Sequence, residues 1–192
     1  MTIHTDKTKL AAAVVASLAV LTGSANAREV SSPAPNLEAR VVELGQVQGL
    51  WAANCPIALG NPTAWAQGDD AEASALHHEG FATGARELLR SDAGDLGVSV
   101  ALRFRSPAGA KADVDRRERL AGQEGYATNF AVPGAPSLRA YTVRAAGSTT
   151  VHVAFVRGTD EYGIAVQAGR TTDVKALERA VATAARREAR HV

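Results

Sequence analysis

The chain has 192 residues, with 21 lysines and arginines against 20 aspartates and glutamates. This near-neutral balance argues against nucleic acid as a bulk electrostatic partner, because nucleic-acid-binding domains carry an excess of basic residues. The length is sufficient for one domain with a proper hydrophobic core. The single cysteine, Cys55, excludes an intramolecular disulfide.

Residues 1–27 have the three features of a secretory signal peptide. Two lysines form a basic start, residues 10–21 are apolar, and Ala25 and Ala27 provide the small side chains of a cleavage site. The apolar run is shorter than the roughly 20 residues that a membrane-spanning helix needs. We therefore predict cleavage after Ala27, a secreted, extracytoplasmic location, and no transmembrane segment after cleavage. A lipoprotein would carry a cysteine directly after the cut, where this chain has Arg28.

The mature chain is expected to consist of a leader and one domain. Residues 28–36 are rich in serine and proline, which is typical of a disordered segment. Residues 37–192 are predicted to form a single domain, because neither a repeat nor a second compositional block is evident. The first part, residues 37–44, is compatible with a helix or a strand. We favour a short helix capped by Asn36.

The middle of the chain begins with a segment that lacks clear periodicity. Residues 50–65 contain two prolines, which predicts an irregular segment packed by Trp51 and Trp65. Acidic residues then open a helix over residues 69–78, where they suit the helix dipole. Residues 81–90 fit either a continued helix or a strand, and the nearby glycines favour a strand.

Residues 98–105 show the clearest alternation of apolar side chains with polar or small ones. This alternation predicts a half-buried strand, with one face in the core and the other in solvent. Ser106 and Pro107 suit the N-cap and first position of a helix, which is predicted to run to about Ala121. Residues 122–136 are expected to form a connecting loop.

Residues 138–190 carry the clearest architectural signal, which is three strands followed by one helix. The strands alternate with a period of two and are separated by turns that contain glycine, so they predict an antiparallel meander. The helix begins after Asp173, and its apolar stripe is expected to cover one face of the meander. The sequence thus predicts an α+β fold, a mainly antiparallel sheet with helices packed on it as a sandwich.

A family resemblance rests on Gly80-Phe81, residues 98–104, Ser106 and Gly109-Ala110, followed by three strands and a helix. In this pattern the chain resembles small secreted or envelope proteins of unknown function from GC-rich Gram-positive bacteria. The order of elements over residues 70–190 is also similar to the PsbP/Mog1-type α/β/α sandwich, which some mycobacterial-type secreted lipoproteins resemble. The missing lipidation cysteine departs from those lipoproteins. The resemblance implies binding or scaffolding, because that family is mostly non-catalytic.

His77, His78 and Glu79 are the first candidates for metal binding or acid–base chemistry. Residues three or four positions away share a helix face, but those positions hold no second strong ligand for either histidine. Cys55 would need a histidine such as His152 as a base for thiol catalysis. A buried thiol near Trp51 is the favoured interpretation instead. We therefore predict no catalytic residue, no metal site and no cofactor.

Aromatic and basic residues are better candidates for contact with a partner, namely Trp51, Trp65, Arg103 and Arg105. The two arginines lie on one predicted strand face, and the next helix adds further arginines, so together they could hold an anionic glycan or phosphate. Acidic residues interleaved in that helix favour a solvated, salt-bridged face instead.

Three functional hypotheses follow. The leading one is a secreted, non-catalytic binding or interaction domain of the cell envelope or the extracellular space, whose partner is a protein or a small ligand. The second is a small secreted hydrolase that uses His152, or His77 and His78, with a nearby carboxylate. The third is an inhibitor-like protein that docks on an enzyme through the loop of residues 51–65. Convergence of these groups in one pocket would favour the hydrolase, and scattered positions would favour binding.

Overall fold

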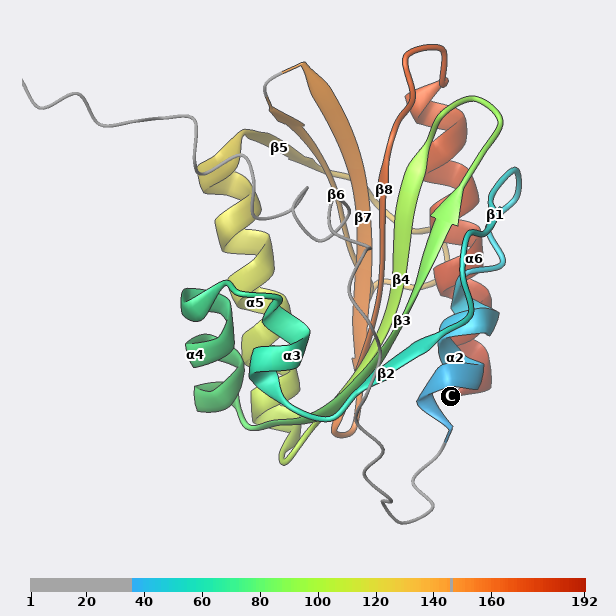
Figure 1. Cartoon of the computed structure of the whole chain (residues 1–192). Coiled ribbons are helices and arrows are strands. Elements are labelled where there is room, and N and C mark those ends of the chain that lie inside the picture. The colour runs from blue at the N-terminus through green and yellow to red at the C-terminus, as the bar shows by residue number, and fades with distance from the viewer. Residues whose placement is uncertain (1–35, 146) are drawn as a thin grey trace, which may run out of the picture.

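A computed structural model describes residues 36–145 and 147–192 and places them around an eight-stranded antiparallel sheet (Figure 1). The strand order is β1-β3-β4-β8-β7-β6-β5, and β2 pairs with β3 in addition. The strands are β1 (Trp51–Ala52), β2 (Ile57–Leu59), β3 (Phe81–Arg90), β4 (Leu96–Phe104), β5 (Tyr126–Asn129), β6 (Arg139–Ala145), β7 (Ser148–Arg157) and β8 (Asp160–Gln167). The predicted signal peptide and leader residues 28–35 lie outside the described residues.

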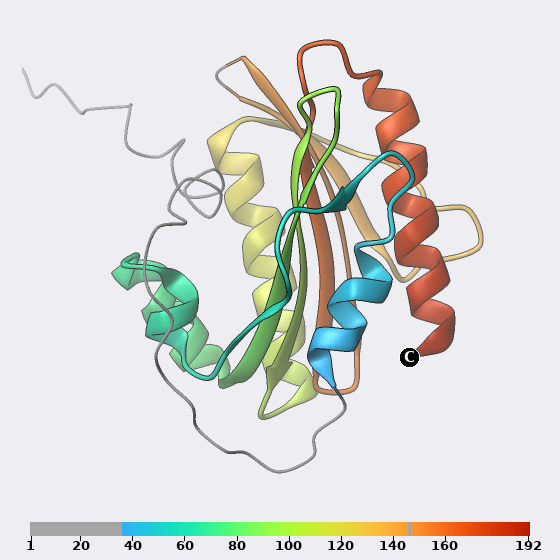
Figure 2. The same cartoon turned by 45° about the vertical axis from the view of Figure 1, so that its right-hand side comes forward.

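Helices cover both faces of the sheet and complete a three-layer arrangement (Figures 1 and 2). On one face lie α2 (Leu37–Leu44) and α6 (Val174–His191), and on the other lie α3 (Pro62–Ala66), α4 (Asp70–Glu79) and α5 (Pro107–Glu124). This arrangement confirms the predicted α+β fold with helices packed on a mainly antiparallel sheet. It also confirms a helix for residues 37–44 and a strand for residues 81–90. Across the described ranges, no helix combines the length and apolar character that a membrane crossing requires.

The predicted C-terminal meander is present as β6, β7 and β8, which pair in succession. Gly158 lies in the tight turn between β7 and β8, and its φ of 58° is in the left-handed region that glycine adopts without strain. After β8, the Asp173 side chain caps α6 by accepting a hydrogen bond from the backbone N–H of Lys175 at 2.9 Å. The helix then packs on the meander, as its apolar stripe predicts.

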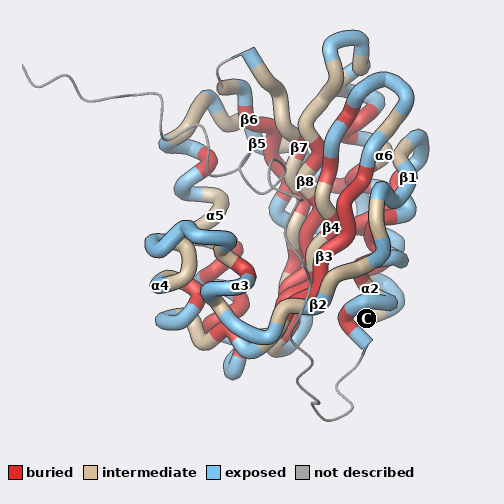
Figure 3. The backbone as a smooth tube through the Cα atoms, in the orientation of Figure 1, coloured by how far each residue is buried: buried red, intermediate tan, exposed pale blue. Residues whose placement is uncertain are grey.

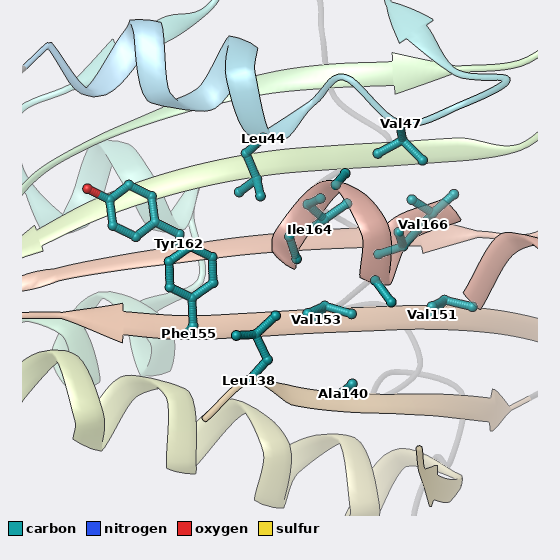
Figure 4. Close-up of a cluster of buried hydrophobic side chains, with 14 of the residues drawn as sticks. Leu44, Val47, Leu138, Ala140, Val151, Val153, Phe155, Tyr162, Ile164 and Val166 are labelled. Carbon is teal, nitrogen blue, oxygen red and sulfur yellow. The ribbon is translucent and has the colours of Figure 1, made fainter. Parts of the chain in front are cut away.

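The main core fills the space between the sheet and the helix pair α2 and α6 (Figure 4). Leu177 and Val181 of α6 are buried in it, whereas Val174 at the helix start is only partly buried. The rings of Phe155 and Tyr162 stack with their centroids 5.1 Å apart. Alternate residues of β7 and β8 supply the sheet side of this core: Val151, Val153, Phe155, Tyr162, Ile164 and Val166.

A second, smaller core lies on the opposite face of the sheet and contains Trp65, Phe81, Leu102 and Phe104. The Trp65 ring packs directly on Gly84 of β3, where an added Cβ would lie 2.8 Å from the ring. Figure 3 shows the buried residues along the central strands and the inner sides of the helices. The sheet therefore separates two apolar regions, of which the one beneath α6 is larger.

Two segments have more regular structure than the sequence predicts. Residues 50–65 contain β1 and β2, whose backbone pairs with β3, and most of α3. The expected loop at residues 122–136 begins later, since α5 continues to Glu124, and it contains β5, which pairs with β6. Both segments contain short strands whose backbone partners belong to other elements, so local periodicity cannot reveal them.

β4 is buried on both faces, which corrects the prediction that one of its faces meets solvent. Ser99 and Ala101 are buried beneath α2, and the Ser99 hydroxyl donates a hydrogen bond to the backbone carbonyl of Val41 at 2.9 Å. A small polar side chain can thus occupy a covered position when a helix carbonyl accepts its proton.

Cys55 is exposed, so the prediction of a buried thiol is wrong. It lies in the break between β1 and β2, two strands that pair only with β3 at the margin of the sheet. Of the two tryptophans in this segment, Trp65 enters the second core, whereas Trp51 is 39% exposed. The tryptophan near Cys55 therefore does not shield its thiol.

Candidate functional site

A groove runs between α6 and the chain that connects α2 to β1, and it is a candidate for a binding site. Its volume is about 1030 Å³. Four segments line it: the α2–β1 connection, the β3–β4 turn, the β8–α6 turn and the side of α6 that carries Ala176, Ala180 and Ala184. Figure 2 turns this side of the molecule forward and shows the α2–β1 connection beside α6.

Small side chains of α6 form the floor of the groove. Ala176, Ala180 and Ala184 recur at intervals of four residues and therefore lie on one side of the helix. Leu177, which also contributes to the main core, adds to this apolar lining, and Leu50 and Trp51 add to it from the facing segment. Because alanine extends little beyond the backbone, a bound chain can approach the helix closely along this line.

Asp95 holds two walls of the groove together. Its carboxylate accepts hydrogen bonds from the Ser91 hydroxyl at 2.6 Å, from the Gly169 backbone N–H at 2.7 Å, and from the Thr172 hydroxyl. Burial alone would raise the pKa of Asp95, but these three hydrogen bonds hold it below its ordinary value. The ionised carboxylate therefore joins the β3–β4 turn to the residues that precede α6.

The opposite end of the groove is fixed by Arg187 of α6. Its guanidinium donates to the backbone carbonyls of Glu43 at 3.2 Å and Gln46 at 2.9 Å. Glu43 lies in the last turn of α2 and Gln46 just after it, where backbone acceptors lack helical partners. The groove is thus framed by polar contacts at both ends, which makes it a preformed feature of the fold.

Trp51, one of the four predicted partner-binding residues, lines this groove. Its ring lies against the guanidinium of Arg90, with 6.0 Å between that group and the ring centroid. Trp65 is only 8% exposed and belongs to the second core. The structure therefore separates the two tryptophans, and partner binding by Trp51 stays a prediction.

Arg103 and Arg105 lie in β4 and just after it, away from the groove. Arg103 donates to both carboxylate oxygens of Asp160, at 2.7 and 2.5 Å, which occupies its planar donor edge. Arg105 is exposed, and its backbone N–H donates to the Gly80 carbonyl at 2.8 Å. The four predicted residues thus do not form one surface.

A second cluster of polar residues joins α4, α5 and β8, but it is a partly buried ionic network. Arg116 donates to Glu72 at 2.5 Å and to Glu79 at 2.8 Å. Arg117 donates to Asp113 at 2.6 Å and to Glu72 at 2.7 Å, and Asp113 is fully buried. The prediction of a solvated face on this helix is therefore wrong for these residues, because α4 packs over them.

Glu161 of β8 extends the network to the sheet: its Oε1 lies 4.0 Å from the Nε of Arg117, and its Oε2 is buried without a hydrogen-bond partner among the described residues. Burial, followed by the charge of Asp113, raises the pKa of Glu161 well above its ordinary value. Burial would also raise the pKa of Asp113, but Arg117 and Arg116 outweigh it and keep this pKa low. Of these two carboxyl groups, Glu161 is therefore the one that holds its proton more strongly.

The predicted catalytic candidates lie on different elements. His77 and His78 are exposed at the end of α4, and Cys55 is at the β1–β2 margin. His152 lies on β7, stacked on Tyr141 with the ring centroids 4.9 Å apart, and its Nε2 is buried without a hydrogen-bond partner. Burial and the nearby Arg117 lower the pKa of His152 to about 4. In the described part of the chain, no three or more histidine, cysteine or acidic residues are placed to hold a metal ion.

Sequence reasoning missed most of the groove. The interval of four residues between Ala176, Ala180 and Ala184 could have been noticed in the sequence. It predicts a line of small side chains along one side of a helix that is otherwise rich in charged residues. Asp95 gives no signal of its own, since its partners come from the β3–β4 turn and from residues more than seventy positions later.

No protein-family model matches the sequence, and no curated protein matches it. Among solved structures, the extracellular domain of PknH from Mycobacterium tuberculosis is similar to this chain with a TM-score of 0.47 and 11% sequence identity. The similarity covers 79% of this chain and 91% of that domain. It is too low to place the chain in a family.

Proposed function

We propose that the mature chain is a secreted, non-catalytic binding domain of the cell envelope or the extracellular space. We propose further that the groove beside α6 holds a segment of a protein partner. The observation that carries this proposal is the groove itself, with its alanine floor and its ends fixed by Asp95 and Arg187. A preformed apolar surface framed by polar groups is typical of binding sites.

The dimensions of the groove support a peptide segment as the occupant. Small-molecule pockets enclose about 300–1,000 Å³, and this groove, at about 1030 Å³, lies at the upper limit. Its floor follows α6 from Ala176 to Arg187, a length of roughly 17 Å at a rise of about 1.5 Å per residue. An extended peptide of about five residues spans that length at about 3.3 Å per residue.

The two alternative functions have less structural support. A hydrolase would need one of its histidines beside a nucleophile and a carboxylate, but His152, the His77–His78 pair and Cys55 lie on separate elements. An inhibitor-like loop would present residues 51–65 to an enzyme. Much of that segment is attached to β3 through β1 and β2, and it ends with Trp65 in the core.

Site-specific photocrosslinking in the native culture tests the proposal. Benzoylphenylalanine at position 176 places the probe in the groove, and the same group at the exposed Ala112 of α5 is the matched control. We expect the probe at position 176 to capture a specific protein that the control does not capture. Ala180→Trp, which fills the groove, should abolish that capture, while Ala112→Trp should not. Equal capture from both positions, or capture that survives Ala180→Trp, would overturn the proposal.

A further inference from the structure

The contact between α2 and α6 contains a carboxyl group that is almost wholly buried. The two helices lie side by side on one face of the sheet (Figures 1 and 2). Glu188, in the last turn of α6, is only 2% exposed. Its Oε1 lies 3.5 Å from the Nη1 of Arg40 in α2. Glu188 must therefore either bury a negative charge at this contact or keep a proton there.

Arg40 is shared between Glu188 and a second acid, Glu43, which lies 2.9 Å from it within α2. The same nitrogen atom of Arg40 faces both carboxyl groups, so the two acids lie close to each other. Removal from water and a nearby like charge both oppose the ionisation of a carboxyl group. Because Glu43 keeps contact with solvent, both effects act most strongly on the buried Glu188.

The other charged groups at this end of α6 are bound to backbone atoms or exposed. Arg187 donates to two backbone carbonyls at the end of α2. Arg157, the last residue of β7, donates to two backbone oxygen atoms at the end of α6. His191, about one turn beyond Glu188, is exposed. Among the described residues, Arg40 is therefore the one cation within 4.0 Å of the Glu188 carboxyl group.

The sheet beneath α2 presents a second buried acid and an arginine that is already paired. Arg103 of β4 donates two hydrogen bonds to Asp160. Burial is the main reason why the pKa of Tyr162 in β8 is raised to about 12, so its hydroxyl stays neutral near pH 7. Glu87 of β3 is 4% exposed, and burial raises its pKa. A Cβ added to Gly45, at the end of α2, would lie 2.7 Å from the Glu87 Oε2. Buried carboxyl groups thus face α2 from the sheet and from α6.

We propose that α2 is a pH-dependent strap, which docks firmly on α6 while Glu188 holds a proton and loosens when Glu188 is ionised. With the proton in place, the buried group is neutral and Arg40 balances Glu43. Without the proton, two carboxylates compete for one guanidinium inside the contact. Burial, followed by the charge of Glu43, raises the pKa of Glu188 to about 7, which places the transition near neutral pH.

Docking of α2 should weaken as the pH rises. A glutamate in water has a pKa of about 4.3, so between this value and about 7 the docked state binds a proton that the loosened state does not. Each increase in pH within that range favours the loosened state, and above it the dependence levels off. Loosening would withdraw Leu37, Val41 and Leu44 from the main core. The groove would also lose the carbonyls that hold Arg187.

Hydrogen exchange of the α2 amides in the mature chain, measured at several pH values from about 5.5 to about 8, tests this proposal. We expect their protection factors, relative to those of α5, to fall about tenfold or more over this range. In Glu188→Gln, which cannot ionise, the relative protection should stay constant. Glu178→Gln is the matched control, because Glu178 is also a buried acid of α6 but is bonded to Thr142 and Lys175. Glu178→Gln and His191→Gln should both keep the pH dependence.

Protection of α2 that does not change with pH in the wild type would overturn the proposal. So would a pH dependence that survives Glu188→Gln, or one that disappears in either control. If Glu188→Gln does not fold, carbon-13 NMR of the Glu188 carboxyl group in the wild type decides. A titration midpoint near 7 is expected, and a midpoint near 4.5 would contradict the proposal. Glu43→Gln should lower this midpoint, because it removes the neighbouring negative charge, and an unchanged midpoint would show that the two acids do not interact.

Discussion

Asp113 is the buried acid that pairs with two arginines of α5. It is fully buried, and Arg116 and Arg117 both donate to it. Glu72 and Glu79 of α4 share these arginines, and Glu161 adds a buried carboxyl from β8, whose pKa is raised by burial and by the charge of Asp113. Removing charged groups from water costs free energy, and their ion-pair partners offset that cost. Loss of one partner should therefore destabilise the fold.

Asp113→Asn removes the fully buried negative charge that both arginines contact and should destabilise the protein by about 3–5 kcal/mol, because only Glu72 and Glu79 then remain to balance Arg116 and Arg117. The same change at Asp115, which pairs with Lys111 at the surface at 2.5 Å, should cost less than about 1 kcal/mol. Urea denaturation of both variants measures the difference. Equal midpoints would mean that the network contributes no more than a surface pair.

His152 gives the protein an acid sensitivity of its own. Its pKa is lowered to about 4 by burial and by Arg117, whereas a histidine in an unfolded chain has a pKa of about 6.5. Between these values the unfolded chain binds a proton that the native state does not, so stability falls as the pH decreases.

His152→Phe should remove this contribution, while its ring can still stack on Tyr141. Relative to the wild type, we expect the variant to gain free energy of unfolding as the pH is lowered from about 7.5 to about 5. Urea denaturation at several pH values measures the gain, and NMR of the wild type should show the His152 ring titrating near pH 4. A difference that does not change with pH would contradict the prediction.

At the scale of elements, the contact between α4 and α5 depends on one glycine. Gly109 lies in the first turn of α5, where an added Cβ would overlap the backbone carbonyl oxygen of Glu79. This close approach brings the arginines of α5 within reach of Glu72 and Glu79. The spacing of the two helices thus determines whether the ionic network can form.

Gly109→Ala should destabilise the protein by about 1–3 kcal/mol, because the added methyl group must push two backbones apart. Gly122 of the same helix has no atom within 4 Å of its added Cβ, so Gly122→Ala should stabilise by about 0.5–1 kcal/mol through helix propensity. The opposite signs can be read from thermal unfolding. Stabilisation by Gly109→Ala would show that the helices are not in contact there.

At the scale of the whole molecule, the attachment of α6 to the sheet shapes both the main core and the groove. Leu177 contributes to both. Its inner side meets residues of β7 and β8, and its neighbours Ala176 and Ala180 line the groove. The same docked helix therefore contributes to the core and also lines the groove.

Leu177→Ala should lower the free energy of unfolding by about 2–5 kcal/mol, since it removes a branched side chain from a packed core and leaves a cavity. Arg190→Ala, at an exposed position of the same helix, should change it by less than about 1 kcal/mol. Urea denaturation of the mature chain gives both values. Similar midpoints for the two variants would mean that α6 is not docked on the sheet in this way.

The sequence by itself was sufficient to predict the elements that depend on contacts between residues close together in the chain. The meander follows from alternation and glycine turns, and the starts of α5 and α6 follow from Ser106 and Asp173, whose side chains cap those helices. These features depend on contacts a few residues apart, so they can be read along the chain.

Tertiary structure decided whatever depends on contacts between distant residues. β1, β2 and β5 exist because β3 and β6 pair with them. Cys55 is exposed, and Asp113 is buried, because of where neighbouring elements pack. The groove combines segments from residue 46 to residue 187, so no local pattern could outline it. A periodic sequence specifies which face of a helix is apolar, but only the packed fold specifies what covers that face and what remains free to bind.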